Sequence, residues 1–423
     1  MAAASTPPGS PPPDGSTRSR PTSGPPPSAP DVRPLVHALV LALAAGLLVG
    51  APAGASYDDS SRAPAPRAPR TWHVGPDRDL EAPSAAAAVA GDGDTVLIDP
   101  GTYSGDVATW TQDDLTLRGD GGRAHLRADG NDAQGKAIWV IAGDRTTVDR
   151  IELSGAAVPD RNGAGIRAEG TDLTVTRSWF HHNEMGILTG ADPESDIVVS
   201  RSRFFRNGFG DGYSHNLYVG AVRSLTVTGS WLSRADTGHE IKSRAARNTI
   251  VGNRISDGDA TASYSIDLPD GGLSLVAGNV VVQGPRSDNP ALVSYGAEGL
   301  TNPGHTLWVV HNTFVNQRSS GTFVSLAAGA RAHLRNNLFV GPGDLTSAFT
   351  SATVELRANR RVGPDSFVDP DREDYRLLAS SPAVDRGGPV PRRWRPRWEY
   401  AAPADRVRRP TVGRPDLGAH ELR

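Results

Sequence analysis

From residue 71 onward, the chain consists of short runs in which hydrophobic and polar residues alternate. Apolar residues at every second position are typical of a β-strand with one buried face. One hydrophobic position recurs every 23 to 33 residues along these runs. Its members are Phe180, Phe204, Leu232, Ile255, Val281, Phe314 and Phe339. A β-strand repeat of this length predicts a solenoid.

The repeat lacks the leucine spacing of leucine-rich repeats, so the pattern favours a parallel β-helix in which each coil pairs with its neighbours. Asparagines recur at the turns, and we expect them to form side-chain ladders between coils. They are Asn207, Asn253, Asn279, Asn312 and Asn337. An alanine-rich segment at 84–90 predicts a short N-terminal helix that caps the open end of the solenoid.

A second set of short strands follows the turn in each coil. We expect one aliphatic residue per coil to face the interior. These are Ile166, Ile187, Leu217, Ile241, Ile266, Leu292 and Val324. The residue after each should face outward. This outward row is Arg167, Leu188, Tyr218, Lys242, Asp267, Val293 and Ser325.

The polar members of the outward row come from three consecutive coils, which parallel strands place ~4.8 Å apart. Tyr218, Lys242 and Asp267 should therefore be neighbours, and Asn216 should lie beside Glu240. We expect further polar residues at the margins of this patch, with loops 207–214 and 296–305 as its walls. The marginal residues are His215, His239, Arg244, Asp270 and Tyr295.

Composition narrows the classes of function. The chain has 423 residues and no cysteine, which excludes disulfides and thiolate chemistry. Its net charge of −3 gives no basis for nucleic-acid binding. Of its 44 basic residues, Lys136 and Lys242 are the only lysines. Lysine, unlike arginine, can give up its proton, so Lys242 in the polar patch is a candidate catalytic residue. We expect a monomer.

The N-terminal part differs in character. Residues 1–34 are rich in proline and serine, which predicts disorder. Arginines, an apolar run at 35–49 and an Ala-Gly-Ala ending at residue 55 indicate a secretory signal over 35–55, or an uncleaved membrane anchor. Either would place the rest outside the cytoplasm. We expect a linker at 56–70, the β-helix at 71–341 and an irregular segment at 342–423 that packs its tryptophans on the solenoid.

Two stretches carry a resemblance to a known family. The sequence Gly-Asp-Gly-Asp-Thr-Val-Leu-Ile-Asp-Pro-Gly-Thr-Tyr at 91–103 is one. The other is the ending, with Ser-Pro-Ala-Val-Asp at 381–385 and Asp-Leu-Gly-Ala-His-Glu at 416–421. Together with the coils, they resemble secreted bacterial right-handed parallel β-helix proteins of the pectin-lyase-like superfamily. The resemblance implies the fold and leaves the reaction open, because this superfamily holds lyases, hydrolases, esterases, epimerases and adhesins.

The superfamily's lyases cleave acidic polysaccharides by β-elimination, often with Ca²⁺. In that hypothesis Lys242 is the base, Arg244 binds the uronate carboxylate and Tyr218 donates a proton. Asn216, Glu240 and Asp267 would hold the saccharide or a calcium ion. The stretch 240–244 only faintly resembles that of chondroitinase-B-like and alginate lyases, since its lysine is out of register and the expected Leu-Arg-His-Gly is Leu-Pro-Asp-Gly at 268–271. Neighbouring carboxylates also favour the protonated lysine.

Two alternatives remain open. A glycoside hydrolase could pair Glu240 with Asp267, whose Cα atoms should lie ~8 Å apart, within the range of inverting enzymes, or Asp267 with Asp270. A non-catalytic carbohydrate-binding solenoid would need exposed aromatics, of which the outward rows offer few. His215 and His239 are candidate bases or substrate contacts. No spacing of histidine with acidic residues indicates a transition-metal site.

Overall fold

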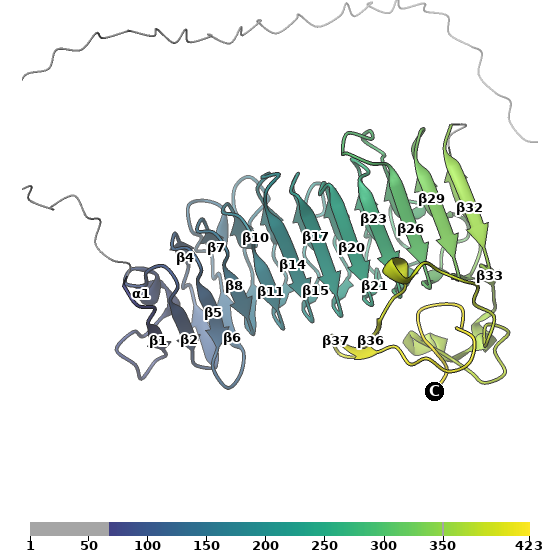
Figure 1. Cartoon of the computed structure of the whole chain (residues 1–423). Coiled ribbons are helices and arrows are strands. Elements are labelled where there is room, and N and C mark those ends of the chain that lie inside the picture. The colour runs from purple at the N-terminus through teal and green to yellow at the C-terminus, as the bar shows by residue number, and fades with distance from the viewer. Residues whose placement is uncertain (1–66, 349–350) are drawn as a thin grey trace, which may run out of the picture. The chain divides into compact units, whose positions relative to one another are not determined.

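The computed structural model describes residues 67–348 and 351–423. Within these ranges the chain forms a parallel β-solenoid built of three sheets, which confirms the predicted all-β fold (Figure 1). The segments expected to be disordered, to direct export and, up to residue 66, to act as a linker lie outside the described residues. No helix in the described ranges is long and apolar enough to cross a membrane.

Each sheet takes one strand from successive coils, and all neighbours within it are parallel. Sheet A contains β1 (Thr71–Val74), β2 (Thr95–Ile98), β5 (Thr116–Gly119), β8 (Thr147–Asp149), β11 (Thr174–Thr176), β14 (Asp196–Ser200), β17 (Ser224–Thr228), β20 (Arg247–Val251), β23 (Leu273–Ala277), β26 (Thr306–Val310), β29 (Arg331–Arg335) and β32 (Thr353–Arg357). Sheet B contains β3 (Gly101–Ser104), β6 (Ala124–Arg127), β9 (Ile151–Ser154), β12 (Trp179–His181), β15 (Arg203–Phe205), β18 (Trp231–Ser233), β21 (Arg254–Ser256), β24 (Val280–Gln283), β27 (Thr313–Asn316), β30 (Leu338–Val340) and β33 (Arg360–Arg361). Sheet C contains β4 (Ala108–Trp110), β7 (Ala137–Ile141), β10 (Ala164–Ala168), β13 (Met185–Thr189), β16 (Leu217–Val219), β19 (Ile241–Ser243), β22 (Ile266–Leu268), β25 (Ala291–Tyr295), β28 (Thr322–Leu326) and β31 (Asp344–Ala348). The coils continue beyond the expected end at residue 341.

The hydrophobic position that revealed the repeat forms one interior stack in sheet B. Its seven members, Phe180 to Phe339, are consecutive Cα partners from β12 to β30, and each is fully buried. The rings of Phe180 and Phe204 lie parallel, with centroids 4.8 Å apart. The prediction of this stack from spacing alone is confirmed.

The interior stack of sheet C differs from the prediction at one coil. Val293, not Leu292, is the Cα partner of Ile266 and of Val324, so Ser294 follows Asp267 in the outward row. Leu292 is buried as well, because the residue before each stack member lies at a bend that also faces the interior. A Cβ atom built on Gly165 at this bend position would come within 2.9 Å of the Phe180 ring.

The predicted asparagine ladder is two ladders at different turns. Asn253, Asn279, Asn312 and Asn337 form one, in which each side-chain amide donates to the next carbonyl oxygen at 3.0 Å. Asn207 belongs to the other, at the turn into sheet C, where its Nδ2 donates to Asn216 Oδ1 at 2.7 Å. The two turns both favour asparagine because buried amides satisfy backbone groups in adjacent coils.

Both ends of the solenoid are covered. Helix α1 (Pro83–Ala87) lies beside β4 and places Ala86 in the interior core, so it caps the N-terminal end as predicted, although it is shorter than 84–90. The C-terminal segment packs on the outer faces of sheets A and B and stacks Trp394 on Trp308 of β26, with centroids 5.2 Å apart (Figure 1). Its elements are η1 (Pro364–Ser366), β34 (Phe367–Asp369), η2 (Pro370–Arg372), β35 (Asp374–Leu377), η3 (Arg392–Trp394), β36 (Trp398–Ala401) and β37 (Asp405–Arg408).

Candidate functional site

The strand register brings the predicted polar patch together on the outer face of sheet C. Tyr218 of β16, Lys242 of β19 and Asp267 of β22 are consecutive Cα partners. Lys242 points outward and keeps 13% of its side-chain surface exposed. These residues, with Arg244, Asp270 and Glu298, form what we call the sheet C cluster. The cluster lies at the middle of the solenoid, as the sequence predicted.

Two cations of the cluster share one carboxylate. Glu298 reaches Lys242 Nζ with Oε1 at 2.9 Å and accepts a hydrogen bond from Arg244 with Oε2. Burial would raise the pKa of Glu298, but the hydrogen bonds from Arg244 and Lys242 outweigh it and lower that pKa. Glu298 belongs to loop 296–305, which we predicted as a wall, yet no pattern singled out this residue. The cluster therefore binds a carboxylate with two cations.

Arg244 also organises the rest of the cluster. Its Nε donates a hydrogen bond to the hydroxyl of Tyr218 at 3.0 Å, and its second terminal nitrogen donates to Asp270 Oδ1 at 2.8 Å. Lys242 Nζ lies 3.4 Å from Asp267 Oδ2. The guanidinium thus fixes the phenol hydroxyl next to the place where Glu298 presents its carboxylate.

His215 and His239 form a buried ladder beside the cluster. Their rings are parallel at 4.7 Å, and each Nδ1 accepts a backbone N–H of the next coil, from His239 and Tyr264 respectively. Burial lowers the pKa of His239 to about 3 and that of His215 well below its usual value, so both rings are neutral. Because Nδ1 accepts, Nε2 must carry the proton. Neither ring then has a lone pair for a substrate proton, so the expectation of a histidine base is wrong.

Asp267 is the most confined carboxylate of the cluster. Only 2% of its surface is exposed, and its Oδ1 has no hydrogen-bond partner among the described residues. Burial raises the pKa of Asp267, while the nearby Lys242 ammonium opposes that rise. Asp267 Oδ2 also lies 3.5 Å from His239 Nε2. This carboxylate therefore holds Lys242 in position from below, whereas Glu298 contacts it from the loop.

Three residues that we expected in the patch lie inside the solenoid. Asn216 and Glu240 occupy the inward bend position, and Tyr295 follows Val293 in the interior and donates to Gly272 O. Glu240 is fully buried, with Oε1 accepting from Ala235 N at 2.9 Å and Oε2 accepting from Asn216. The proposed hydrolase pair of Glu240 and Asp267 is wrong, because the two side chains project from opposite sides of the sheet.

The donor set of the cluster does not fit calcium. Asp267, Asp270 and Glu298 each already face Lys242 or Arg244 of the same cluster. A calcium ion needs six to eight oxygen ligands. The Lys242 and Arg244 cations at the centre of the cluster would repel it. The residues of the sheet C cluster are therefore unsuited to hold a calcium ion.

Loop 207–214 supplies an exposed aromatic side chain next to the cluster. Tyr213 precedes His215 by two residues and keeps 82% of its surface exposed. Phe209 of the same loop is 43% exposed and lies under Arg161, whose guanidinium is 4.7 Å from the ring centroid. An exposed tyrosine at the edge of a polar patch is suited to stacking on a sugar ring.

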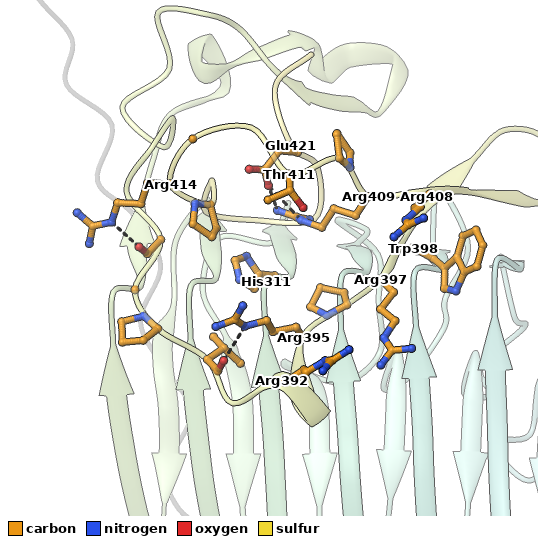
Figure 2. A pocket seen from close by; sticks show the side chains of 18 residues that line it. His311, Arg392, Arg395, Arg397, Trp398, Arg408, Arg409, Thr411, Arg414 and Glu421 are labelled. Atoms are coloured by element: carbon orange, nitrogen blue, oxygen red, sulfur yellow. Dashed lines mark hydrogen bonds and ion pairs between the residues drawn. The ribbon is translucent and has the colours of Figure 1, made fainter.

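A separate cavity of about 730 Å³ lies between the C-terminal segment and the solenoid (Figure 2). Its wall contains six arginines and His311 of the turn before the Asn312 ladder residue. The arginines are Arg392, Arg395, Arg397, Arg408, Arg409 and Arg414. Several are already engaged, since Arg395 donates to Val390 O, Arg414 donates to Gly387 O, and Arg409 pairs with Glu421 at 2.8 Å. These contacts hold parts of the C-terminal segment to one another.

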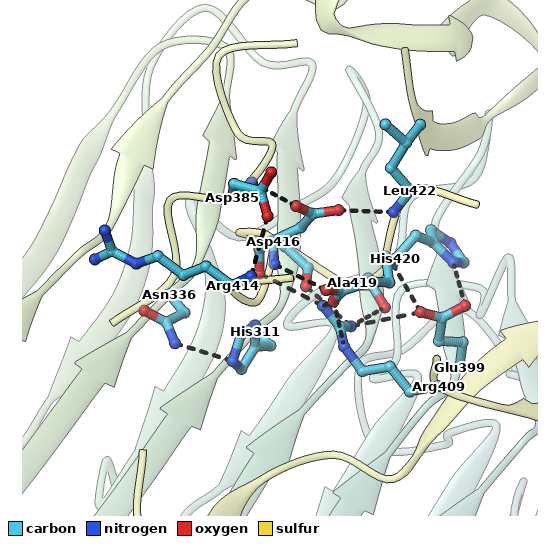
Figure 3. Close-up of polar contacts among 12 residues, drawn as sticks. His311, Asn336, Asp385, Glu399, Arg409, Arg414, Asp416, Ala419, His420 and Leu422 are labelled. Atoms are coloured by element: carbon cyan, nitrogen blue, oxygen red, sulfur yellow. Dashed lines mark hydrogen bonds and ion pairs between the residues drawn. The ribbon is translucent and has the colours of Figure 1, made fainter. Parts of the chain in front are cut away.

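The family-like motifs have structural roles. Asp94 of the first motif accepts hydrogen bonds from Arg70 N and Trp72 Nε1, each at 2.7 Å, and so joins the first two coils. Asp416 of the ending accepts from the backbone N–H groups of Asp385 at 2.6 Å and Leu422 at 2.7 Å (Figure 3). The two pieces of the ending, 381–385 and 416–421, therefore form one folded unit rather than a reactive site.

No family model and no curated protein matches the sequence. Among solved structures, pectate lyase Pel9A is similar with a TM-score of 0.61 and 15% identity, over 84% of this chain and 96% of that one. A rhamnogalacturonan lyase gives 0.48 at 10% identity, over 77% and 97% of the two chains. A PL6-family alginate lyase gives 0.36 at 15%, over 70% and 40%. The match to Pel9A along most of both chains shows that this chain shares its parallel β-helix fold.

Proposed function

We propose that the chain cleaves an acidic polysaccharide by β-elimination on the outer face of sheet C. The observation that supports this best is the Glu298 carboxylate held by Lys242 and Arg244 beside the Tyr218 hydroxyl. A uronate carboxylate entering the site would take the place of Glu298 and pair with the Arg244 guanidinium. Neutralising that carboxylate makes the adjacent C5 proton more acidic, which is the first requirement of an elimination.

The roles follow from the contacts. Arg244 binds the substrate carboxylate, and Lys242 takes the C5 proton as general base. The electron pair forms the C4–C5 double bond, the C4–O bond breaks, and Tyr218 protonates the leaving oxygen. In this arrangement Lys242 Nζ contacts the carboxylates of Asp267 and Glu298. A general base needs a free lone pair aimed at the substrate, so this function requires that loop 296–305 withdraw Glu298 when the substrate binds.

We place this activity outside the cytoplasm, because the apolar run at 35–49 and the small-residue ending at 55 are typical of an export signal. The same surface would also serve a non-catalytic protein that binds acidic glycans. Lys242 and Arg244 supply the charge for either function, whereas only the elimination requires a lysine that can lose its proton.

Substitutions at Lys242 distinguish the two functions. Lys242→Ala should reduce kcat/KM on the cleaved polysaccharide by about 10²–10⁴, the usual effect of losing a general base. Lys242→Arg keeps the charge but cannot act as a base, so it should be nearly as inactive. Lys136→Arg is the matched control, because Lys136 also pairs with a carboxylate, that of Glu169 at 2.6 Å.

Full activity in Lys242→Arg would remove lysine from the base role and leave it as a carboxylate ligand. Binding of an acidic polysaccharide without cleavage by the wild-type chain would contradict the elimination and support the binding function. Unchanged binding in Arg244→Ala, measured by titration calorimetry, would contradict both, because the same carboxylate site serves both.

A further inference from the structure

A second cluster of polar side chains lies on the outer face of sheet B, near the N-terminal end of the solenoid. His125 of β6, Glu152 of β9 and His181 of β12 come from three neighbouring strands. His125 and Glu152 are direct Cα partners, and His181 is two residues further along its strand, opposite Ser154. The three side chains are partly buried.

One donor atom from each of the three residues lies within 4.8 Å of the other two. Glu152 Oε1 is 3.1 Å from His181 Nε2 and 3.7 Å from His125 Nδ1. Tetrahedral metal sites with bonds of ~2.0–2.1 Å place their ligand atoms ~3.3 Å apart. The observed separations lie on either side of that value, so small side-chain movements would suffice to enclose an ion.

Each of the three residues is held by a different neighbour through the atom that does not point into the cluster. His125 Nε2 lies 2.7 Å from Ser154 Oγ, and His181 Nδ1 lies 2.9 Å from His182 Nδ1. Glu152 Oε2 accepts a hydrogen bond from Arg123 at 3.4 Å. Metal-binding histidines and carboxylates typically have such partners, which fix the tautomer and the orientation of the ligand.

Further contacts fix the rings. His181 packs on the indole of Trp179, with centroids 4.4 Å apart. His182 Nδ1, 2.9 Å from His181 Nδ1, can accept the proton that His181 must carry there when its Nε2 binds an ion.

We propose that His125 Nδ1, Glu152 Oε1 and His181 Nε2 form a binding site for a divalent transition-metal ion, with Zn²⁺ as the preferred ion. Two imidazoles and one carboxylate suit zinc, whereas calcium and magnesium prefer oxygen ligands alone. Three protein ligands leave a fourth position for water or a glycan oxygen. The ion would also connect three successive coils.

Sequence motifs could not reveal this site. The ligands follow one another at 27 and 29 residues, one per coil, and not at the short spacings of known zinc motifs. The proposal departs from the expectation drawn from residue spacing, because these ligands come together only when the coils stack. Aligning the coils on the sheet B stack would have shown His125 next to Glu152.

The test uses the purified, untagged full chain after removal of metals with a chelator. Titration with zinc chloride in a calorimeter should show one ion per chain, and cobalt(II) should give the visible absorption of a four-coordinate site. Glu152→Gln and His181→Ala should abolish both signals. Ser154→Ala and His182→Ala, which remove only the supporting contacts, should weaken zinc binding by ~10–100-fold.

His333→Gln is the matched control. His333 pairs with Glu355 at 2.6 Å on the outer face of sheet A, so it is also a histidine–glutamate pair on a coil surface. Its substitution should leave zinc affinity unchanged. Zinc binding that survives in Glu152→Gln and His181→Ala, or that falls equally in the control, would overturn the proposal. Melting curves of the metal-free variants that match the metal-free wild type would show that the losses are not due to unfolding.

Discussion

Two carboxyl groups buried inside the solenoid should each make a contribution to its stability that falls as the pH rises. Glu240 and Asp257 are both fully buried. Asp257 Oδ2 accepts hydrogen bonds from Ser287 Oγ at 2.5 Å and from Gly284 N at 3.3 Å. Burial nevertheless raises the pKa of Asp257 from 3.8 to about 7, and burial and the charge of Asp257 raise the pKa of Glu240.

The direction of this pH dependence follows from which state, folded or unfolded, binds the proton more tightly. Between a pKa near 4 in the unfolded chain and about 7 in the folded chain, the folded state holds a proton on Asp257 that the unfolded state has lost. The contribution of Asp257 to the unfolding free energy is therefore highest below pH ~4, falls as the pH rises, and levels off above pH ~7, whereas buried His215 and His239, whose pKa is lowered, contribute in the opposite direction. A pKa that is higher by about 3 in the folded chain corresponds to ~4 kcal/mol of unfolding free energy. The raised pKa of Glu240 acts in the same direction.

Asp257→Asn removes this titration. The variant can keep the hydrogen bonds of Asp257, because the asparagine carbonyl can accept from Ser287 and Gly284 while its amide donates to Ser265. We expect it to raise the unfolding free energy at pH ~8 by up to ~4 kcal/mol and to change it little at pH ~4. Urea unfolding of both proteins at the two values measures this. Asp259→Asn, an exposed acid in the same loop, should leave the pH dependence unaltered. A difference in unfolding free energy between wild type and Asp257→Asn that is the same at both pH values would contradict this prediction.

Three further predictions concern the site and the coils. Glu298→Gln should lower KM for an acidic polysaccharide by ~2–30-fold, because two exposed ion pairs worth ~0.2–1 kcal/mol each no longer compete with the substrate; a raised KM would contradict this. Gly238→Ala should cost ~1–3 kcal/mol in a melting assay, since its Cβ would lie 1.8 Å from the Ser214 carbonyl oxygen, whereas Gly190→Ala, with 3.6 Å of space, should be neutral. Asn279→Ala should cost ~2–4 kcal/mol by urea unfolding, because Ile250 O and Asn253 N in the preceding coil and the Asn312 side chain in the next coil lose their partner; a loss below ~1 kcal/mol would contradict the ladder.

The fold could be predicted from the sequence because every coil of a solenoid repeats the same pattern of buried and exposed positions. The same apolar position recurs in every coil, and parallel pairing turns that spacing directly into neighbours in space. This is why the stack from Phe180 to Phe339 and the row of Tyr218, Lys242 and Asp267 were found from spacing alone.

The errors arose where a coil departs from strict alternation. At the bend into sheet C, two successive residues face the interior, so alternation placed Glu240 outside although it is buried. At β25, Leu292 and Val293 are both apolar and both buried, so alternation could not distinguish which of them is the Cα partner of Ile266. Glu298 was missed because its loop carries no repeat, and only the folded structure places it on Lys242.

The tautomers of His215 and His239 could not be predicted either. Each depends on a backbone N–H from the next coil, which no side-chain pattern reports. The sheet B cluster could not be predicted for a similar reason. Its three residues lie 27 and 29 positions apart in the sequence and become neighbours only when the coils stack.

The central claim is that the sheet C cluster catalyses an elimination. The most direct measurement incubates the wild-type chain with a panel of acidic polysaccharides in ¹⁸O-labelled water and follows ultraviolet absorbance and product mass together. The account predicts that one acidic polysaccharide gives products that absorb in the ultraviolet, carry the new double bond and contain no label, and that Lys242→Ala gives none. Products that lack the absorbance and contain ¹⁸O would show hydrolysis and contradict the account.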